Sequence, residues 1–214
     1  NAKASDAIYG TNPPAAGFDF FQGPRIKTNV AADTAIFKGK KWSGYKNLPM
    51  TAAYYFAQGG TPDYQDPQQG VSAGAQQFYN LFQGFVSRSG VPFPIPTQNQ
   101  VPGGPKSTQY PLSGDPVAGT GYLDGAINPP GDRRMGSASG TFTLAYGDTQ
   151  EVVVAQIAAG ARTGISNIRA ITLLKAADKE AQKAFNNFFP KPTPFLNPVV
   201  EIVNLDRQVV LNWG

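Results

Sequence analysis

Apolar residues recur at two different periods along the chain, and the longer period predicts two helices. Spacing at i, i+3, i+4 and i+7 predicts amphipathic helices near residues 73–86 and over residues 166–189. Ser166 or Asn167 is positioned to cap the second helix, and Pro190 ends it. The two apolar stripes consist of Phe78, Leu81, Phe82 and Phe85, and of Ile168, Ile171, Leu174, Ala181, Phe185 and Phe188.

Alternating apolar and polar positions predict strands elsewhere. In residues 18–21, Asp19 alternates with Phe18 and Phe20 between breaks rich in glycine and proline. Residues 34–42 and 50–58 also predict strands, because residues such as Tyr54, Tyr55 and Phe56 are typical of strands. Residues 141–146 alternate strictly and lead through the turn sequence YGDT into residues 151–158, which predicts a hairpin. Because residues 151–158 are apolar on both faces, we expect that strand near the middle of a sheet or sandwich.

Long segments without periodicity divide the chain. Residues 89–132 are rich in proline and glycine, and loops of this length are either functional or disordered. Residues 190–198, PKPTPFLNP, predict an extended linker. Residues 199–214 predict two strands around a turn at residues 205–208, with Val209, Leu211 and Trp213 on one face.

These patterns predict a mainly β chain with two helices, in the α+β class. We expect a sandwich-like β domain over residues 1–189, the linker over residues 190–198 and the first strands of another β-sandwich over residues 199–214. Two strands alone are marginal in water, so the last segment needs a second sheet to cover it.

Composition and charge narrow the function. Charged residues make up 15% of the 214, and the net charge of +4 is spread along the chain without a basic run longer than two residues. Nucleic-acid binding is therefore disfavoured. No apolar run is long enough to span a membrane, and no signal peptide opens the sequence NAKASDAIYG, so we expect a processed or partial chain.

The chain has no histidine and no cysteine. This excludes Ser-His-Asp and Cys-His nucleophiles, disulfides and histidine-ligated zinc. A glycosidase would need two carboxylates across a cleft, and the spacing of the loop aspartates singles out no pair. We expect no enzyme activity and no cofactor, apart from calcium as discussed below.

Adjacent arginines, Arg133 and Arg134, follow Asp132 in a turn-rich loop. Two roles are open. The pair forms a bidentate clamp for a carboxylate or sulfate group of a glycan or partner, or it is structural. In the structural case, which we favour, one arginine binds Asp178 of the second predicted helix or caps loop carbonyls around Asp132.

Two weaker candidates involve loop side chains. Calcium prefers carboxylate and carbonyl oxygens from loops, but no calcium-loop motif is present and turn formation explains the same aspartates. Aromatic side chains stack on sugar rings, although such residues in strands are usually core. The calcium candidates are Asp63, Asp66, Asp115 and Asp124, and the sugar candidates are Trp42, Tyr45, Tyr54, Tyr55, Tyr64 and Tyr122.

An ordered series of motifs resembles a region of large exported proteins. These motifs are GFDFFQGP (17–24), FKGK (37–40), GYKNLPMT (44–51), QFYNLFQG (77–84), PLSGDPVAGTGYLD (111–124), PPGDRRM (129–135), GTFTLAYGDTQEVVVAQIAA (140–159) and LLKAADKEAQKAF (173–185). The series resembles mostly uncharacterised secreted or surface proteins of Bacteroidetes-type bacteria. In those proteins a fibronectin type III domain commonly follows, and many carry a type IX secretion sorting domain at the C-terminus.

The resemblance implies an extracellular or cell-surface location, and residues 199–214 resemble the opening strands of the fibronectin-like domain. It implies no activity and no catalytic residues. We therefore expect a structural or adhesive segment that packs with neighbouring domains of a long chain and assembles into fibres or surface layers. The alternative is a module that binds a polysaccharide or peptide through residues 89–132.

Overall fold

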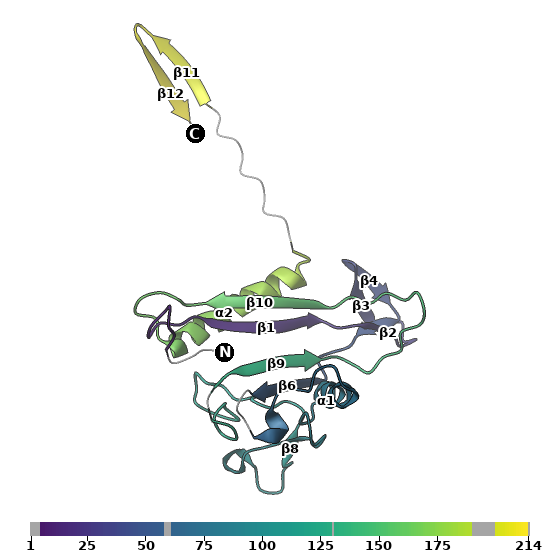
Figure 1. Ribbon diagram of the computed structural model, residues 1–214. Coiled ribbons are helices and arrows are strands. Elements are labelled where there is room, and N and C mark those ends of the chain that lie inside the picture. Colours follow the sequence, from purple (N-terminus) through teal and green to yellow (C-terminus); the bar gives the residue numbers. More distant parts are fainter. Residues whose placement is uncertain (1–4, 58–60, 130, 190–199, 214) are drawn as a thin grey trace.

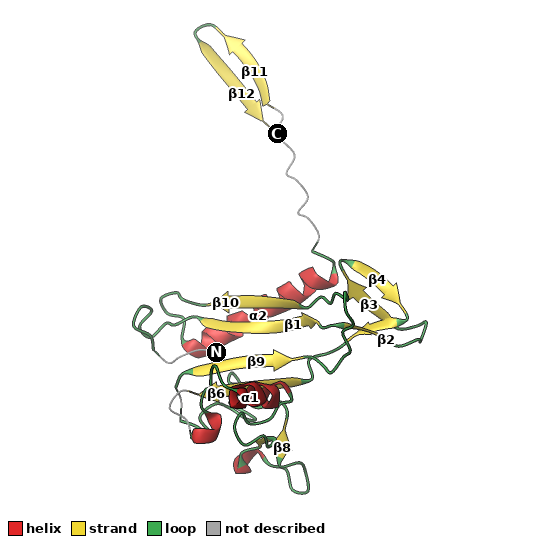
Figure 2. Cartoon of the chain, turned by 45° about the vertical axis from the view of Figure 1, so that its right-hand side comes forward, coloured by secondary structure: helices red, strands yellow, loops and turns green. Residues whose placement is uncertain are grey.

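The computed structural model describes residues 5–57, 61–129, 131–189 and 200–213. The described strands form six two-stranded sheets, and two α-helices accompany them (Figures 1 and 2). The expectation of a mainly β chain with two helices is confirmed. No helix in these ranges combines the length and the apolar character needed to cross a membrane.

The first layer pairs two strands that are far apart in sequence. Strand β1 (Ala15–Gln22) runs antiparallel to β10 (Val153–Ala159), and helix α2 (Asn167–Asn186) packs on one face of the pair (Figure 1). The ring of Phe21 stacks on Phe185 with centroids 5.1 Å apart. At Gly17 an added Cβ would lie 3.3 Å from Leu174, so the helix packs closely on the strand there.

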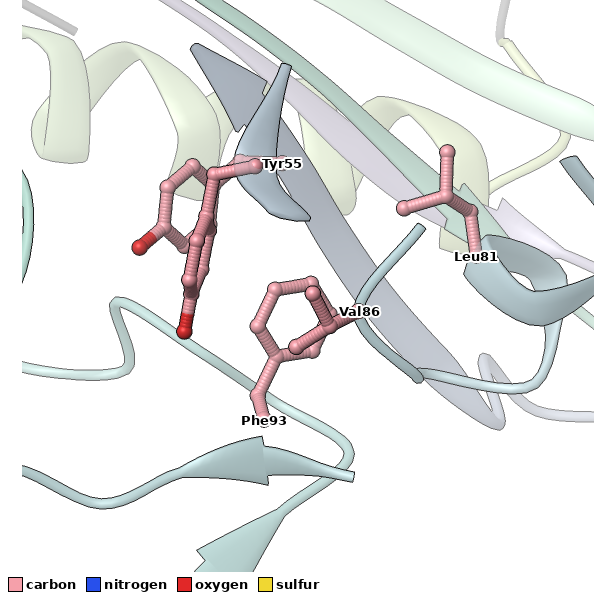
Figure 3. Close-up of a cluster of buried hydrophobic side chains, with 5 residues drawn as sticks. Tyr55, Leu81, Val86 and Phe93 are labelled. Atoms are coloured by element: carbon pink, nitrogen blue, oxygen red, sulfur yellow. The ribbon is translucent and has the colours of Figure 1, made fainter. Parts of the chain in front are cut away.

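A second pair carries the buried core. Strand β6 (Ala52–Ala57) runs antiparallel to β9 (Arg133–Ala138), and α1 (Ser72–Phe82) contacts β6. Tyr55, in the middle of β6, is buried against residues from the long loops (Figure 3). The buried cluster comprises Tyr55, Tyr64, Leu81, Val86 and Phe93.

Shorter elements surround these two layers. β2 (Arg25–Lys27) pairs with β5 (Tyr45–Asn47), and β3 (Thr34–Phe37) pairs with β4 (Lys40–Ser43). The segment expected as one strand over residues 34–42 is thus a hairpin, because Lys38 and Gly39 adopt positive φ angles and turn the chain. The remaining short elements are 3₁₀ helix η1 (Pro62–Tyr64), β7 (Phe93–Pro94), 3₁₀ helix η2 (Thr97–Asn99) and β8 (Ser107–Thr108).

The predicted hairpin over residues 141–158 is wrong. Residues 139–152 contain no strand, although the expected turn is present where Asp148 N donates to Ala145 O at 3.0 Å. Strand β10 pairs with β1 instead, and its burial alternates along the strand. In the described part of the chain it is therefore a strand with one covered face rather than a central strand buried on both.

The helices end where the local backbone requires it. Helix α2 begins as predicted, with the Ser166 hydroxyl accepting from Arg169 N at 3.2 Å. It ends at Asn186, because Phe188 and Phe189 adopt positive φ angles. Helix α1 ends at Phe82 rather than residue 86, because Gly84 has φ +74° and cannot continue the helix.

The expected hairpin near the C-terminal end is present. Strands β11 (Val200–Leu205) and β12 (Gln208–Trp213) pair antiparallel around a turn at Asp206 and Arg207. Val209 and Leu211 lie opposite Asn204 and Ile202, so they share one face as expected. The predicted linker, residues 190–198, lies outside the described residues, as does the side chain of Trp213.

Candidate functional site

Arg133, at the start of β9, is the most deeply buried cation of the loop region. Its side chain is 3% exposed, and Nε donates to Asp124 Oδ1 at 3.0 Å. The guanidinium also donates to the carbonyl oxygens of Asn128 and Asp132, each at 3.2 Å, and of Pro129. These contacts agree with the structural role in which an arginine caps loop carbonyls around Asp132.

Arg134 is held at the surface of the same loop. Its Nη1 lies 2.7 Å from Asp66 Oδ2, and its Nη2 lies 3.1 Å from Asp132 Oδ2. The side chain is 45% exposed, so solvent screens this pair far more than it screens Arg133. Both guanidinium groups therefore bind carboxylates of the chain itself, and neither is left as a free anion clamp.

The expected contact between these arginines and Asp178 is wrong. Asp178 lies on α2, which packs on β1 and β10, whereas both arginines lie on β9 and bind carboxylates of the loops. A different cation links α2 to the loops: Lys175 Nζ lies 2.7 Å from Asp115 Oδ2. The sequence contained no signal that distinguishes Lys175 from the other lysines of the helix.

Asp178 instead faces another carboxyl group across the helix–sheet interface. Asp19 on β1 lies within hydrogen-bonding reach of Asp178, and the two groups line a cavity of about 190 Å³ together with Leu174 and Lys175. Burial raises the pKa of Asp19, and the nearby charge of Asp178 raises it further. Ionisation of Asp19 is therefore less favourable here than it is for a solvent-exposed aspartate.

The calcium candidates do not converge. Asp66, Asp115 and Asp124 each bind a different cationic side chain, and nowhere among the described residues do three metal-ligating groups gather. Asp115 also accepts from Val117 N at 2.9 Å, as expected of a turn residue. Lys175 donates a hydrogen bond to Asp115 and lowers the pKa of that carboxyl. Asp63 lies in η1, with Tyr64 after it.

Three of the sugar candidates are core residues. Tyr55, Tyr64 and Tyr122 are at most 7% exposed, so none offers a ring to a ligand. Asn128 Nδ2 donates to Tyr55 Oη at 3.2 Å, and Tyr55 Oη lies 3.4 Å from Tyr122 Oη. Burial raises the pKa of both Tyr64 and Tyr122. Residues 89–132 thus supply packing to the core through Phe93 and Tyr122.

The other three candidates are also held by neighbouring groups. The Arg25 guanidinium lies 4.1, 4.5 and 5.0 Å from the ring centroids of Phe37, Trp42 and Tyr45. This cation–π cluster was not apparent from the sequence, because nothing in it marks Arg25. In the β6–β9 pair, the Tyr54 ring lies over Gly136, where an added Cβ would be 2.4 Å from the ring. Burial raises the pKa of Tyr54.

No family model, curated protein or solved structure matches the chain. We therefore infer the function from the geometry of the described residues. The charged and aromatic candidate residues make intramolecular contacts that hold loops and helices together.

Proposed function

We propose that this chain is a non-catalytic structural segment of a large extracellular or cell-surface bacterial protein, and that copies of it assemble through exposed strands. The single observation that carries this proposal is the β11–β12 hairpin. Every side chain described in its two strands is exposed, including large apolar ones on both faces.

One face of the hairpin is particularly apolar. The register places Val200, Ile202, Val209 and Leu211 on the same side, and Ile202 is 62% exposed. Two strands with an uncovered apolar face are marginal in water, so this hairpin needs another β-surface.

A surface of matching character lies on the β1–β10 pair. Because α2 covers the face that carries Gly17 and Asp19, the side chains of Phe18 and Val154 point away from the helix, and Phe18 is 71% exposed. Ala16 and Ala158 extend the same face. Gln156, opposite Phe18, is a polar residue on this face. The outer face and the hairpin are both short and two-stranded, and both expose apolar side chains.

We assign the outer β1–β10 face of one copy as the surface that covers the β11–β12 hairpin of the next. Stacking the two would form a small four-stranded sandwich, the arrangement in which apolar sheet faces are normally buried. Because the two surfaces are different, the contact is heterologous and repeats from copy to copy. It therefore builds filaments or closed rings.

The finer domain assignment is part of this proposal. The hairpin provides the opening strands of a fibronectin type III-like sandwich whose facing layer, in this proposal, is the outer β1–β10 face of the next copy. Neighbouring domains of the same long chain are further partners. The extracellular location and the export route rest on the resemblance of the ordered motifs. The absence of histidine and cysteine, with Asp66, Asp115, Asp124 and Asp132 each bound to a cationic side chain, supports a non-catalytic role.

Sedimentation velocity over a range of concentrations tests the proposal. The wild-type chain is expected to form species that grow with concentration. Ile202→Lys and Phe18→Lys each place a charge on one of the two surfaces and should leave monomers. Tyr146→Lys is the matched control, because Tyr146 is fully exposed outside both surfaces. A wild-type chain that stays monomeric at every concentration would refute self-assembly.

A further inference from the structure

A groove of about 570 Å³ opens where the C-terminal end of α1 meets residues 137–142, which run from the end of β9 into the following loop. It shares no residue with the two assembly surfaces. Three phenyl rings, two side-chain amides and four hydroxyl groups line it. This volume lies within the usual range of small-molecule sites, roughly 300–1,000 Å³.

The aromatic part of the groove presents exposed ring surface. Phe82, the last residue of α1, and Phe142, from the loop, both line the groove and are exposed. The ring of Tyr54 lies 6.0 Å from that of Phe82 and supports it from the β6 side. The exposed rings of Phe82 and Phe142 offer flat apolar contact to a ligand.

The polar part offers groups that both donate and accept hydrogen bonds. Gln109 Nε2 donates to Gln83 O at 3.1 Å, and its Oε1 has no partner among the described residues. The hydroxyls of Ser137 and Thr141 are likewise unpaired in the described chain. Amides and hydroxyls of this kind complement ligand hydroxyl groups, which also donate and accept.

Among the residues that the structure describes, no aspartate, glutamate, lysine or arginine lines the groove. A charged ligand would lose hydration there without gaining a counter-charge, which is unfavourable. The lining therefore selects a neutral ligand.

The groove is preformed, and the adjoining edge of β6 is already occupied. Ala53 N donates to Gln109 O at 2.9 Å, so a peptide cannot add to β6 as a strand at this position. Ser139 Oγ donates to Pro49 O at 2.8 Å and fixes the opposite wall. At Gly84 an added Cβ would lie 2.8 Å from Gln109, so the helix end and the loop are in close contact.

We propose that this groove binds a neutral oligosaccharide, whose ring faces stack on Phe82 and Phe142 and whose hydroxyls bond to Gln109, Ser137 and Thr141. The site differs from the tyrosines singled out in the sequence. It adds a ligand to the structural role and does not depend on self-assembly.

Isothermal titration calorimetry with three sets of probes tests this site. We expect saturable binding of at least one neutral oligosaccharide from a series of gluco-, xylo- and manno-oligosaccharides. Oligogalacturonate, as the anionic probe, and a neutral Gly-Ser peptide should give no saturable signal. Saturable binding of the peptide, or of oligogalacturonate without any neutral oligosaccharide, would overturn the proposal. So would the absence of binding across the whole neutral series.

Three variants test whether the oligosaccharide binds in this groove. Phe142→Ala should weaken it by about fivefold to tenfold, the loss expected for one stacking ring. Gln109→Ala should also weaken it, and circular dichroism checks that both variants fold. The control Tyr146→Ala removes an exposed ring from the same loop outside the groove and should leave the affinity unchanged. Equal affinity of the wild type and Phe142→Ala would place the ligand elsewhere and refute this site.

Discussion

The carboxyl groups of Asp19 on β1 and Asp178 on α2 face each other where the helix packs on the sheet. Lys175 lines the same cavity, and its ammonium group is engaged with Asp115. On β10, the residues packed against Asp19 carry no charge; its direct partner in the register is Ala155. The acid pair therefore determines how the attachment of α2 responds to pH.

Asp178→Asn should stabilise the protein at neutral pH. The folded pKa of Asp19 is raised, so the folded state binds more protons than the unfolded state once pH exceeds the unfolded value, about 3.9. Stability from this pair is complete below that value and is lost as pH rises through the folded pKa. The advantage of the variant over wild type should therefore shrink as pH falls toward about 4.

Urea unfolding at a series of pH values measures this difference. Glu180→Gln is the matched control, because it removes one negative charge from the exposed side of α2. The lowered pKa of Asp115 acts in the opposite direction and costs stability in acid, but it is common to all three proteins and cancels in the comparison. A pH-independent difference between Asp178→Asn and wild type would contradict the assignment.

Replacing Arg133 should be far more costly than replacing Arg134. Arg133→Met leaves three loop carbonyls and the half-exposed Asp124 without their donor, which should cost about 2–3 kcal/mol. Arg134→Met removes a half-exposed pair and should cost about 1 kcal/mol or less. Chemical denaturation of the two variants checks the ranking, and equal losses would contradict it.

Gly136→Ala should destabilise the β6–β9 pair. The new methyl group would lie 2.4 Å from the Tyr54 ring, and the ring cannot move away freely because it also packs on Phe82. Overpacking of this kind costs roughly 1–3 kcal/mol. Thermal unfolding measures it, with Ser137→Ala as a neighbouring exposed control expected to stay near wild type. If Gly136→Ala is as stable as the wild type, the Tyr54 ring moves aside to accommodate the methyl group and the prediction is wrong.

Tyr64 and Tyr122 should resist ionisation in the folded protein. Burial raises the pKa of both above that of a free tyrosine, about 10. Because the folded state holds these protons more tightly, stability is lost as pH rises above about 10. In an ultraviolet titration, Tyr64 and Tyr122 should ionise only with unfolding. Ionisation of all nine tyrosines together before unfolding would contradict this.

Local signals in the sequence located the helices but not the partners of the strands. The apolar stripe and Ser166 placed the start of α2 correctly, because helix hydrogen bonds and caps are local. The pairing of β10 with β1 joins residues more than 130 apart, for example Phe20 and Val154. Alternation gives the faces of a strand and carries no information about its partner, so residues 141–146 resembled a hairpin arm.

The candidate sites also separate into features that local sequence predicts and features that depend on long-range packing. The loop around Asp132 was recognised as structural from its turn chemistry, and Arg133 does cap its carbonyls. Which carboxylate each arginine binds depends on the arrangement of the layers, which places Asp178 against Asp19 instead. The groove beside Phe82 and Phe142 was not recognised, because its walls come from four separate segments spread over residues 51–142.

The central claim is that two different surfaces of the chain, the β11–β12 hairpin and the outer β1–β10 face, bind each other in successive copies. A mixing experiment tests it most directly. Ile202→Lys retains only the sheet face, and Phe18→Lys retains only the hairpin. By sedimentation velocity each variant alone should be monomeric, and an equimolar mixture should form a dimer and nothing larger. A mixture that remains monomeric, while the wild-type chain assembles, would contradict the pairing of these two surfaces.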